Sequence, residues 1–259
     1  MFNESSILFE DLYHPELVEF YQIFWEISLT YTTVFFIFIL YVIIKKSSKE
    51  MGGYKWYLVH QVFWIFVLDL HLSTWKPVTL WPFFLAYSVG IWRSVSGDFS
   101  YFPIVLLSFI ISGMGFSIYI SFLHRYIQIS PLSFFYKLYS KLWLRFLIYV
   151  PVFITVQSVI ALPMYLMKVP ADLLREVVLA AAPQLGFFFD TEPSVIGYDR
   201  SVNDNMTNFT FVLIGVLGAI MVSIIMLILN YIRMMKNNRK LLTEETTKLQ
   251  VTFRNEEVQ

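Results

Sequence analysis

Residues 55–92, KWYLVHQVFWIFVLDLHLSTWKPVTLWPFFLAYSVGIW, decide how this chain folds. The first half, residues 56–75, is apolar, contains no Lys or Arg, and has a single acidic residue, Asp69. A run of about twenty apolar residues is long enough to cross the hydrocarbon core of a bilayer as a helix. The second half is also apolar, but Pro77 and Pro82 interrupt any regular helix there. The stretch therefore predicts a membrane-spanning helix followed by an aromatic loop.

The whole chain has the composition of a protein that is surrounded by lipid. Of its 259 residues, 57% are hydrophobic and only 15% are charged, whereas a soluble domain usually carries about 25% charged residues. The 19 basic and 19 acidic residues cancel, so no nucleic-acid partner is indicated. The absence of cysteine excludes disulfides, thiolate metal sites and cysteine nucleophiles. We expect membrane lipids around the chain, no metal and no cofactor.

Long apolar runs predict an all-α integral membrane protein with five spans. The expected spans cover residues 23–44, 56–75, 99–123, 142–167 and 209–232. Residues 1–22, in which Pro15 is expected to interrupt any helix, should precede this bundle, and residues 233–259 should form a charged tail. Pro151 and Pro163 fall inside the fourth span, where neighbouring groups can satisfy the carbonyls that proline frees.

Residues 78–97 leave an alternative open, because they could be counted as an additional membrane segment. Pro82, Gly90 and Arg93 oppose a spanning helix there. Trp81 and Trp92 suit the headgroup level of a bilayer, where tryptophan is enriched. We therefore expect an aromatic loop that lies outside the membrane or at its surface.

The distribution of basic residues predicts the orientation of the spans. Lys and Arg are concentrated in the links after the first and third spans and in residues 233–259, whereas residues 1–26 contain six acidic residues and no basic one. Loops rich in Lys and Arg stay on the cytoplasmic side. The sequence thus predicts a multi-pass membrane protein with an extracellular N-terminus and a cytoplasmic C-terminus.

Three Asn-x-Ser/Thr patterns agree with this orientation. They begin at Asn3, Asn205 and Asn208, all on the side that the basic residues predict to be extracellular. Glycans are attached to this pattern on that side, so these residues are candidate N-glycosylation sites. A chance occurrence of a three-residue pattern is the alternative interpretation.

Ionisable residues within the spans are the candidate sites for chemistry. Asp69 is either a polar site for a cation or water network facing the bundle, or an acid near the interface. In the second case it is either neutral or hydrogen-bonded to Ser73, four residues on. His60 and His71 are eleven residues apart, about 16 Å along a helix, so they cannot bind one metal ion and are expected to be structural. An enzyme active site would need clustered His, Asp or Glu, and the expected spans offer only Asp69 and, near the start of the first span, Glu26, so we expect no enzyme.

Five short segments carry a resemblance to a known family. They are YKWYLVHQ (54–61), DLHLSTWKPVTLWPF (69–83), LAYSVG (85–90), FLHRYIQI (122–129) and LLTEETTKLQ (241–250). The first three resemble the second span and the following loop of nematode serpentine chemoreceptors, class I most closely and class H as the alternative. The last two resemble the inner end of the third span and the polar stretch before the sixth span of that family.

The resemblance implies a rhodopsin-like serpentine bundle from a family of seven-transmembrane G-protein-coupled receptors. It implies a small-molecule ligand, a heterotrimeric G protein as partner, and a chemosensory role. Spans six and seven, which should follow residues 241–250, are not found in this sequence, so the chain resembles a receptor truncated after the fifth span. A non-signalling membrane protein that pairs with full-length receptor chains is the alternative function.

Arg125 is the residue that the resemblance marks as a candidate G-protein contact. The sequence His124-Arg125-Tyr126 stands where rhodopsin-like receptors have an acidic residue, Arg and Tyr at the inner end of span three. His124 replaces the acid that would bind the arginine. The alternative is that Arg125 is an ordinary basic residue anchoring a helix end at the membrane surface.

Overall fold

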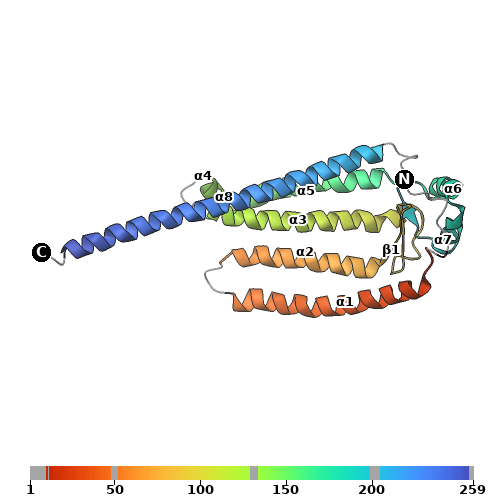
Figure 1. The fold of residues 1–259 in the computed structure, drawn as a ribbon, viewed down its shortest axis with the longest axis horizontal. Helices are drawn as coiled ribbons and strands as arrows, with labels where there is room; N and C mark the ends of the chain where they lie inside the picture. Colours follow the sequence, from red (N-terminus) through yellow and green to blue (C-terminus); the bar gives the residue numbers. More distant parts are fainter. Residues whose placement is uncertain (1–9, 11, 48–51, 129–133, 199–204, 257–259) are drawn as a thin grey trace.

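The computed structural model describes residues 10, 12–47, 52–128, 134–198 and 205–256. Long helices lie side by side in a bundle (Figure 1). They are α1 (Pro15–Tyr41), α2 (Tyr54–Trp75), α3 (Phe102–Gln128), α5 (Leu142–Leu166) and α8 (Asn205–Glu256). Helix α3 is central, because it contacts α2, α5 and α8, while α1 packs against the other side of α2. This arrangement confirms the predicted all-α membrane bundle.

Four helices within the described residues are long and apolar enough to cross a membrane: Pro15–Lys46, Gly97–Gln128, Leu142–Leu166 and Thr207–Met234. Helix α2 has the required length but is more polar, because it carries His60, Gln61, Asp69 and His71. Since α2 lies between α1 and α3 in the same bundle, its role as a fifth span stays a prediction with structural support.

The ends of two helices differ from the sequence-based expectation. Pro15 does not interrupt a helix but starts α1, because proline fits the first helical position, where no backbone N–H bond is needed. The predicted tail after residue 232 is helical as far as Glu256, since α8 continues into it and extends beyond the bundle (Figure 1). Residues 219–256 contain neither Gly nor Pro, so no helix breaker ends α8 at the edge of the apolar run.

Short helical elements flank the long helices. The π-helical turn η3 (Val42–Lys46) extends α1, the 3-10 turn η5 (Gly97–Tyr101) leads into α3, and α4 (Phe134–Ser140) contacts both α3 and α5. Helix α4 lies at the end of the bundle where α2 begins and α3 ends (Figure 1). We call this end the α4 end.

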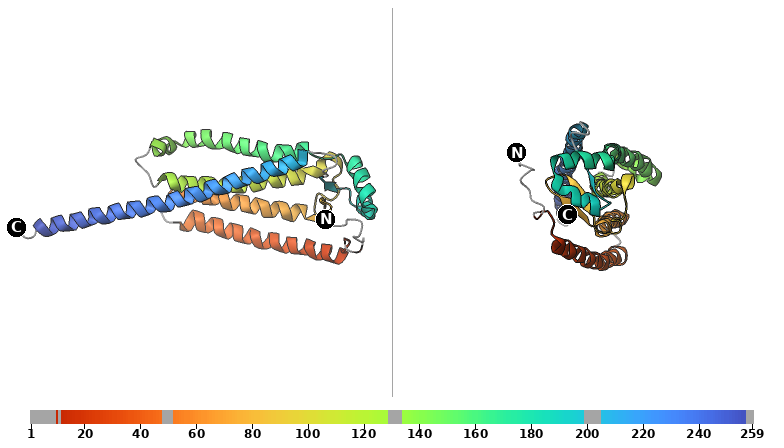
Figure 2. Two further views of the ribbon diagram at one scale, coloured as in Figure 1. Left: turned by 45° about the horizontal axis from the view of Figure 1, so that its top comes forward. Right: turned by 90° about the vertical axis from the view of Figure 1, so that its right-hand side faces the viewer.

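A small folded unit, which we call the cap, covers the opposite end of the bundle and is formed by residues 77–97 and 168–198 (Figure 2). Its helical elements are α6 (Ala171–Ala181), η6 (Pro183–Leu185) and α7 (Gly186–Thr191). Strands β1 (Pro77–Leu80), β2 (Leu85–Ser88) and β3 (Ile196–Gly197) form an antiparallel sheet in the order β1-β2-β3. Residues 78–97 are therefore a hairpin followed by turns, as the loop interpretation expects, and not a spanning helix.

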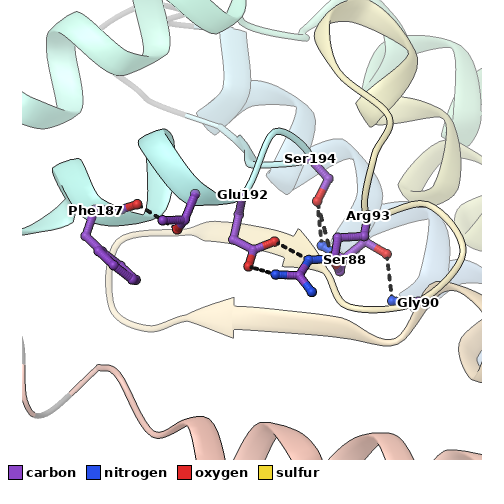
Figure 3. A network of polar contacts seen from close by, with 7 residues as sticks. Ser88, Gly90, Arg93, Phe187, Glu192 and Ser194 are labelled. Carbon is purple, nitrogen blue, oxygen red and sulfur yellow. Dashed lines mark hydrogen bonds and ion pairs between the residues drawn. The ribbon is translucent and has the colours of Figure 1, made fainter.

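The cap has its own hydrophobic core and polar contacts. The core contains Leu80, Leu85, Leu174, Leu185 and Phe188, all almost completely buried. The Arg93 guanidinium donates two hydrogen bonds, of 2.9 and 2.7 Å, to the Glu192 carboxylate (Figure 3). In the interior of the cap, the buried Ser88 amide donates to Ser194 Oγ. The hairpin and the residue 168–198 link are thus joined by both apolar and polar contacts.

Tyr101, the last residue of η5 just before α3, attaches the cap to the bundle. Its hydroxyl lies 2.7 Å from the carbonyl oxygen of Gly197 and 3.1 Å from that of Val169, and can donate to either. Backbone amides of the same two residues point at the phenol oxygen from 3.4 and 3.3 Å. One buried phenol therefore holds both ends of the residue 168–198 link, next to an ion pair of 2.6 Å between Lys168 and Asp98.

Candidate functional site

A polar aromatic cluster joins four helices at the α4 end. His124 of α3 is only 3% exposed, and its ring stacks on Tyr57 of α2 with 4.3 Å between centroids. Its Nδ1 lies 3.1 Å from the Tyr139 hydroxyl of α4, which in turn lies 2.9 Å from the Tyr57 hydroxyl and 2.6 Å from that of Tyr149 on α5. Burial, together with the neighbouring phenols, raises the pKa of Tyr139, so this hydroxyl stays protonated and able to donate.

The sequence of α3 explains how α2 can approach the cluster. Gly113, Ser117, Ser121 and His124 are buried and recur every three or four residues, so they share one face of the helix. Small side chains on this face leave room for the aromatic residues of α2. A Cβ on Gly113 would lie only 2.7 Å from the ring of Trp64, which shows how closely the two helices pack.

Arg125 is adjacent in sequence to His124 but is exposed. Its guanidinium carbon lies 4.1 Å from the centroid of the Tyr54 ring, and the Tyr54 hydroxyl is 3.1 Å from Ser121 Oγ. A cation–π contact with α2 therefore takes the place of the missing acidic neighbour. Arg125 also borders a hollow of about 230 Å³ between α3 and α8, which Tyr231 helps to line.

A larger cavity, of about 550 Å³, lies between α2, α3 and α5 in the half of the bundle nearest the α4 end. Trp56 and Trp64 of α2, Phe116 of α3 and Phe153 of α5 line it, with Arg145 near the helix ends. Its size and apolar lining fall in the range of small-molecule sites. Sequence reasoning did not locate this cavity, because aromatic residues at helical spacing also occur in ordinary packing.

Asp69 lies in α2, half-buried, and accepts a hydrogen bond from the Thr32 hydroxyl of α1. A hydrogen bond to Ser73, which is one of the alternatives for Asp69, is wrong, since Ser73 Oγ is buried without a hydrogen-bond partner among the described residues. Asp69 thus joins α1 to α2. The described residues contain no group of three or more His, Cys, Asp or Glu side chains that could hold a metal ion, and a polar site at Asp69 stays a prediction.

The two histidines of α2 have separate neighbours, in keeping with the structural role expected of them. His60 Nε2 accepts a hydrogen bond of 2.9 Å from the Trp64 indole, and His71 Nε2 lies 2.9 Å from the carbonyl oxygen of Pro103. The His71 ring also packs against Trp75 of the same helix, so the contacts of the two histidines are separate.

The candidate glycosylation sites are placed only in part. Asn3 lies outside the described residues. Asn205 is the first residue of α8, and Asn208 is an exposed residue of the same helix. Both lie where α8 starts, at the cap end of the bundle (Figure 1). Whether any of the three carries a glycan stays a prediction.

The long apolar helices packed around α3 define a multi-pass helical membrane protein. A family model described as serpentine type 7TM GPCR chemoreceptor Srh matches residues 16–256, so the chain belongs to this family of serpentine chemoreceptors. The predicted relation to nematode serpentine receptors is confirmed at this level, and the family is one of receptors, not of enzymes. No curated protein and no solved structure matches the chain in the corresponding searches.

Proposed function

We propose that the chain is a G-protein-coupled chemosensory receptor that binds a small molecule and contacts a heterotrimeric G protein through its α4 end. The match of the serpentine chemoreceptor family to residues 16–256 carries this proposal. The exposed position of Arg125 at the end of the central helix supports the choice of the α4 end. The assignment to class I or class H stays a prediction.

The proposed orientation places the α4 end in the cytoplasm and the cap outside. Lys45 and Lys46 at the end of the first helix, and Lys137 and Lys141 around α4, supply a basic cluster at the α4 end. The Asn-x-Ser/Thr patterns at the start of α8 lie at the cap end. Basic residues favour the cytoplasmic side and glycan acceptors the other, so both features support the same orientation.

Arg125 has the geometry of a residue that can bind an incoming peptide. An arginine that stacks on an aromatic ring keeps the N–H groups at its edge free to donate, because the ring contacts the face of the guanidinium. Those donors, beside the hollow between α3 and α8, suit backbone carbonyl oxygens or a carboxylate of the G protein. Tyr54 fixes the position of the guanidinium before binding.

Substitution Arg125→Ala is expected to lower G-protein activation about ten- to a hundredfold, the effect of losing hydrogen bonds from a charged group. The measurement is guanine-nucleotide exchange by purified heterotrimers added to the chain in lipid nanodiscs, without ligand and with a panel of volatile and water-soluble odorants. Arg175→Ala, an exposed cation of the cap paired with Asp190, is the matched control and should leave exchange unchanged. Equal exchange by Arg125→Ala and the unaltered chain would contradict the proposed contact.

A second function, pairing with full-length receptor chains, is favoured by the exposed apolar surfaces of α5 and α8. Phe146 is 60% exposed and Phe211 is 69% exposed, and both lie on long apolar helices. Co-precipitation with a full-length relative, combined with no exchange by the chain alone at any odorant tested, would support pairing over independent signalling. Odorant-dependent exchange by the chain alone would contradict a purely non-signalling role.

A further inference from the structure

The 550 Å³ cavity opens sideways, towards the bilayer. Ile120 and Phe116 of the central helix form its floor, and Ile120 is almost fully buried. Trp56 on α2 and Phe146 on α5 form its rim and are 58% and 60% exposed. Both rim residues belong to helices of the membrane bundle, so the open side faces lipid acyl chains.

The depth of the cavity fits one leaflet of a membrane. Its lining on α5 extends from Leu142, the first residue of that helix, to Phe153. Eleven residues of α-helix rise about 16 Å, which is about half of the 30 Å hydrocarbon core. The cavity therefore has the length of an acyl chain that enters from the leaflet at the α4 end, whereas a compact odorant would fill only part of it.

The end of the cavity nearest the leaflet surface is positively charged. Arg145 lines it, and this side chain is held in place by donation of its Nε to the carbonyl oxygen of Tyr139, 2.6 Å away, and by stacking at 4.5 Å on the Tyr139 ring. No carboxylate among the described residues forms an ion pair with Arg145.

The surrounding sequence strengthens this charge. Residues 51–68 and 134–167 contain no Asp or Glu, while Lys55, Lys137 and Lys141 lie near the same helix ends. An oriented arginine without a carboxylate partner, among further cations, favours a phosphate group. The cavity is apolar in its depth and positively charged at its opening, so it suits an amphipathic molecule with an anionic headgroup.

We propose that this cavity binds an anionic phospholipid, with one acyl chain between α2 and α5 and the headgroup phosphate on Arg145. The proposal rests on the membrane bundle and not on G-protein coupling or orientation. Because Arg145 also contacts Tyr139 of the polar cluster, the lipid would connect the composition of the leaflet to the packing of the α4 end.

The test is native mass spectrometry of the full chain, released from nanodiscs that contain equal amounts of phosphatidylserine and phosphatidylcholine. Both lipids carry a phosphate, but the choline cation cancels its charge in phosphatidylcholine, whereas phosphatidylserine is a net anion. We therefore expect the chain to retain phosphatidylserine about fivefold or more over phosphatidylcholine, which corresponds to the attraction of one basic side chain for an anionic lipid. Arg145→Gln should abolish the preference, whereas Arg145→Lys, which keeps the charge, should retain most of it. Arg175→Gln in the cap is the matched control and should behave as the unaltered chain.

Two additional experiments distinguish binding of the whole lipid from binding of its headgroup alone. Val150→Trp, at the rim of the cavity, should reduce retention of both lipids by blocking the acyl chain. Soluble glycerophosphoserine should fail to displace the bound lipid, since it has no acyl chain. The proposal is overturned if the unaltered chain shows no preference for phosphatidylserine, if Arg145→Gln and Arg175→Gln have equal effects, or if the soluble headgroup competes fully.

Discussion

Replacing Gly113 with alanine should destabilise the bundle more than other single-methyl changes in α3. The added methyl would lie 2.7 Å from the ring of Trp64, so α2 and α3 would have to separate or the indole would have to leave its place. Overpacking of this kind costs about 1–3 kcal/mol. The expected result is a lower free energy of unfolding, measured by circular dichroism in mixed micelles.

Gly115→Ala is the matched control for this change. It adds the same methyl to the same helix, but nothing lies within 4 Å of the new Cβ. Because alanine favours a helix over glycine, Gly115→Ala should be neutral or stabilise by up to about 1 kcal/mol. If Gly113→Ala proved as well tolerated as Gly115→Ala, the close packing of α2 on α3 would be wrong. A smaller side chain at position 64, as in Trp64→Leu, should relieve the effect of Gly113→Ala.

Tyr101→Phe should loosen the cap while leaving the bundle folded. The substitution removes the hydroxyl that pairs with the backbone of both Val169 and Gly197. Each buried backbone group left without a partner costs about 1–3 kcal/mol. Amide hydrogen exchange should therefore rise across residues 168–198, by about tenfold or more, with little change in α5.

Tyr198→Phe provides the comparison for Tyr101→Phe. The Tyr198 hydroxyl donates only to the carbonyl oxygen of Met164, at 3.1 Å, so its loss should loosen the link less. Equal exchange rates in the two variants would contradict the assignment of Tyr101 as the main attachment of the cap. The attachment of the cap depends on such contacts because the chain has no cysteine, so no disulfide can connect α3 to the residue 168–198 link.

The apolar helices could be predicted from the sequence because their signal is local. The expected span at residues 142–167 agrees closely with α5, Leu142–Leu166, since a long apolar run with one charge, Arg145 near its start, is enough to indicate it. The cap could not be predicted in the same way. Strand β2 pairs Leu85 with Gly197 and Ala86 with Ile196, and pairing across more than one hundred residues leaves no periodic pattern in either segment.

The candidate sites show the same limit. Sequence spacing offered Ser73 as the partner of Asp69, but the side chain of Asp69 meets Thr32 on another helix. The position of Arg125 at a helix end could be predicted because it follows the third apolar run, whereas its contact with Tyr54 depends on how α2 and α3 pack. Local pattern places a residue on a helix, and tertiary packing decides which neighbour it contacts.

The orientation of the bundle in the membrane decides whether Arg125 can reach a G protein. The chain lacks cysteine, so a single introduced cysteine reports one position. In intact cells, a membrane-impermeant maleimide should label Glu176→Cys in the cap directly and Ser140→Cys at the α4 end only after permeabilisation. Labelling of Ser140→Cys in intact cells, with Glu176→Cys protected, would contradict the proposed orientation.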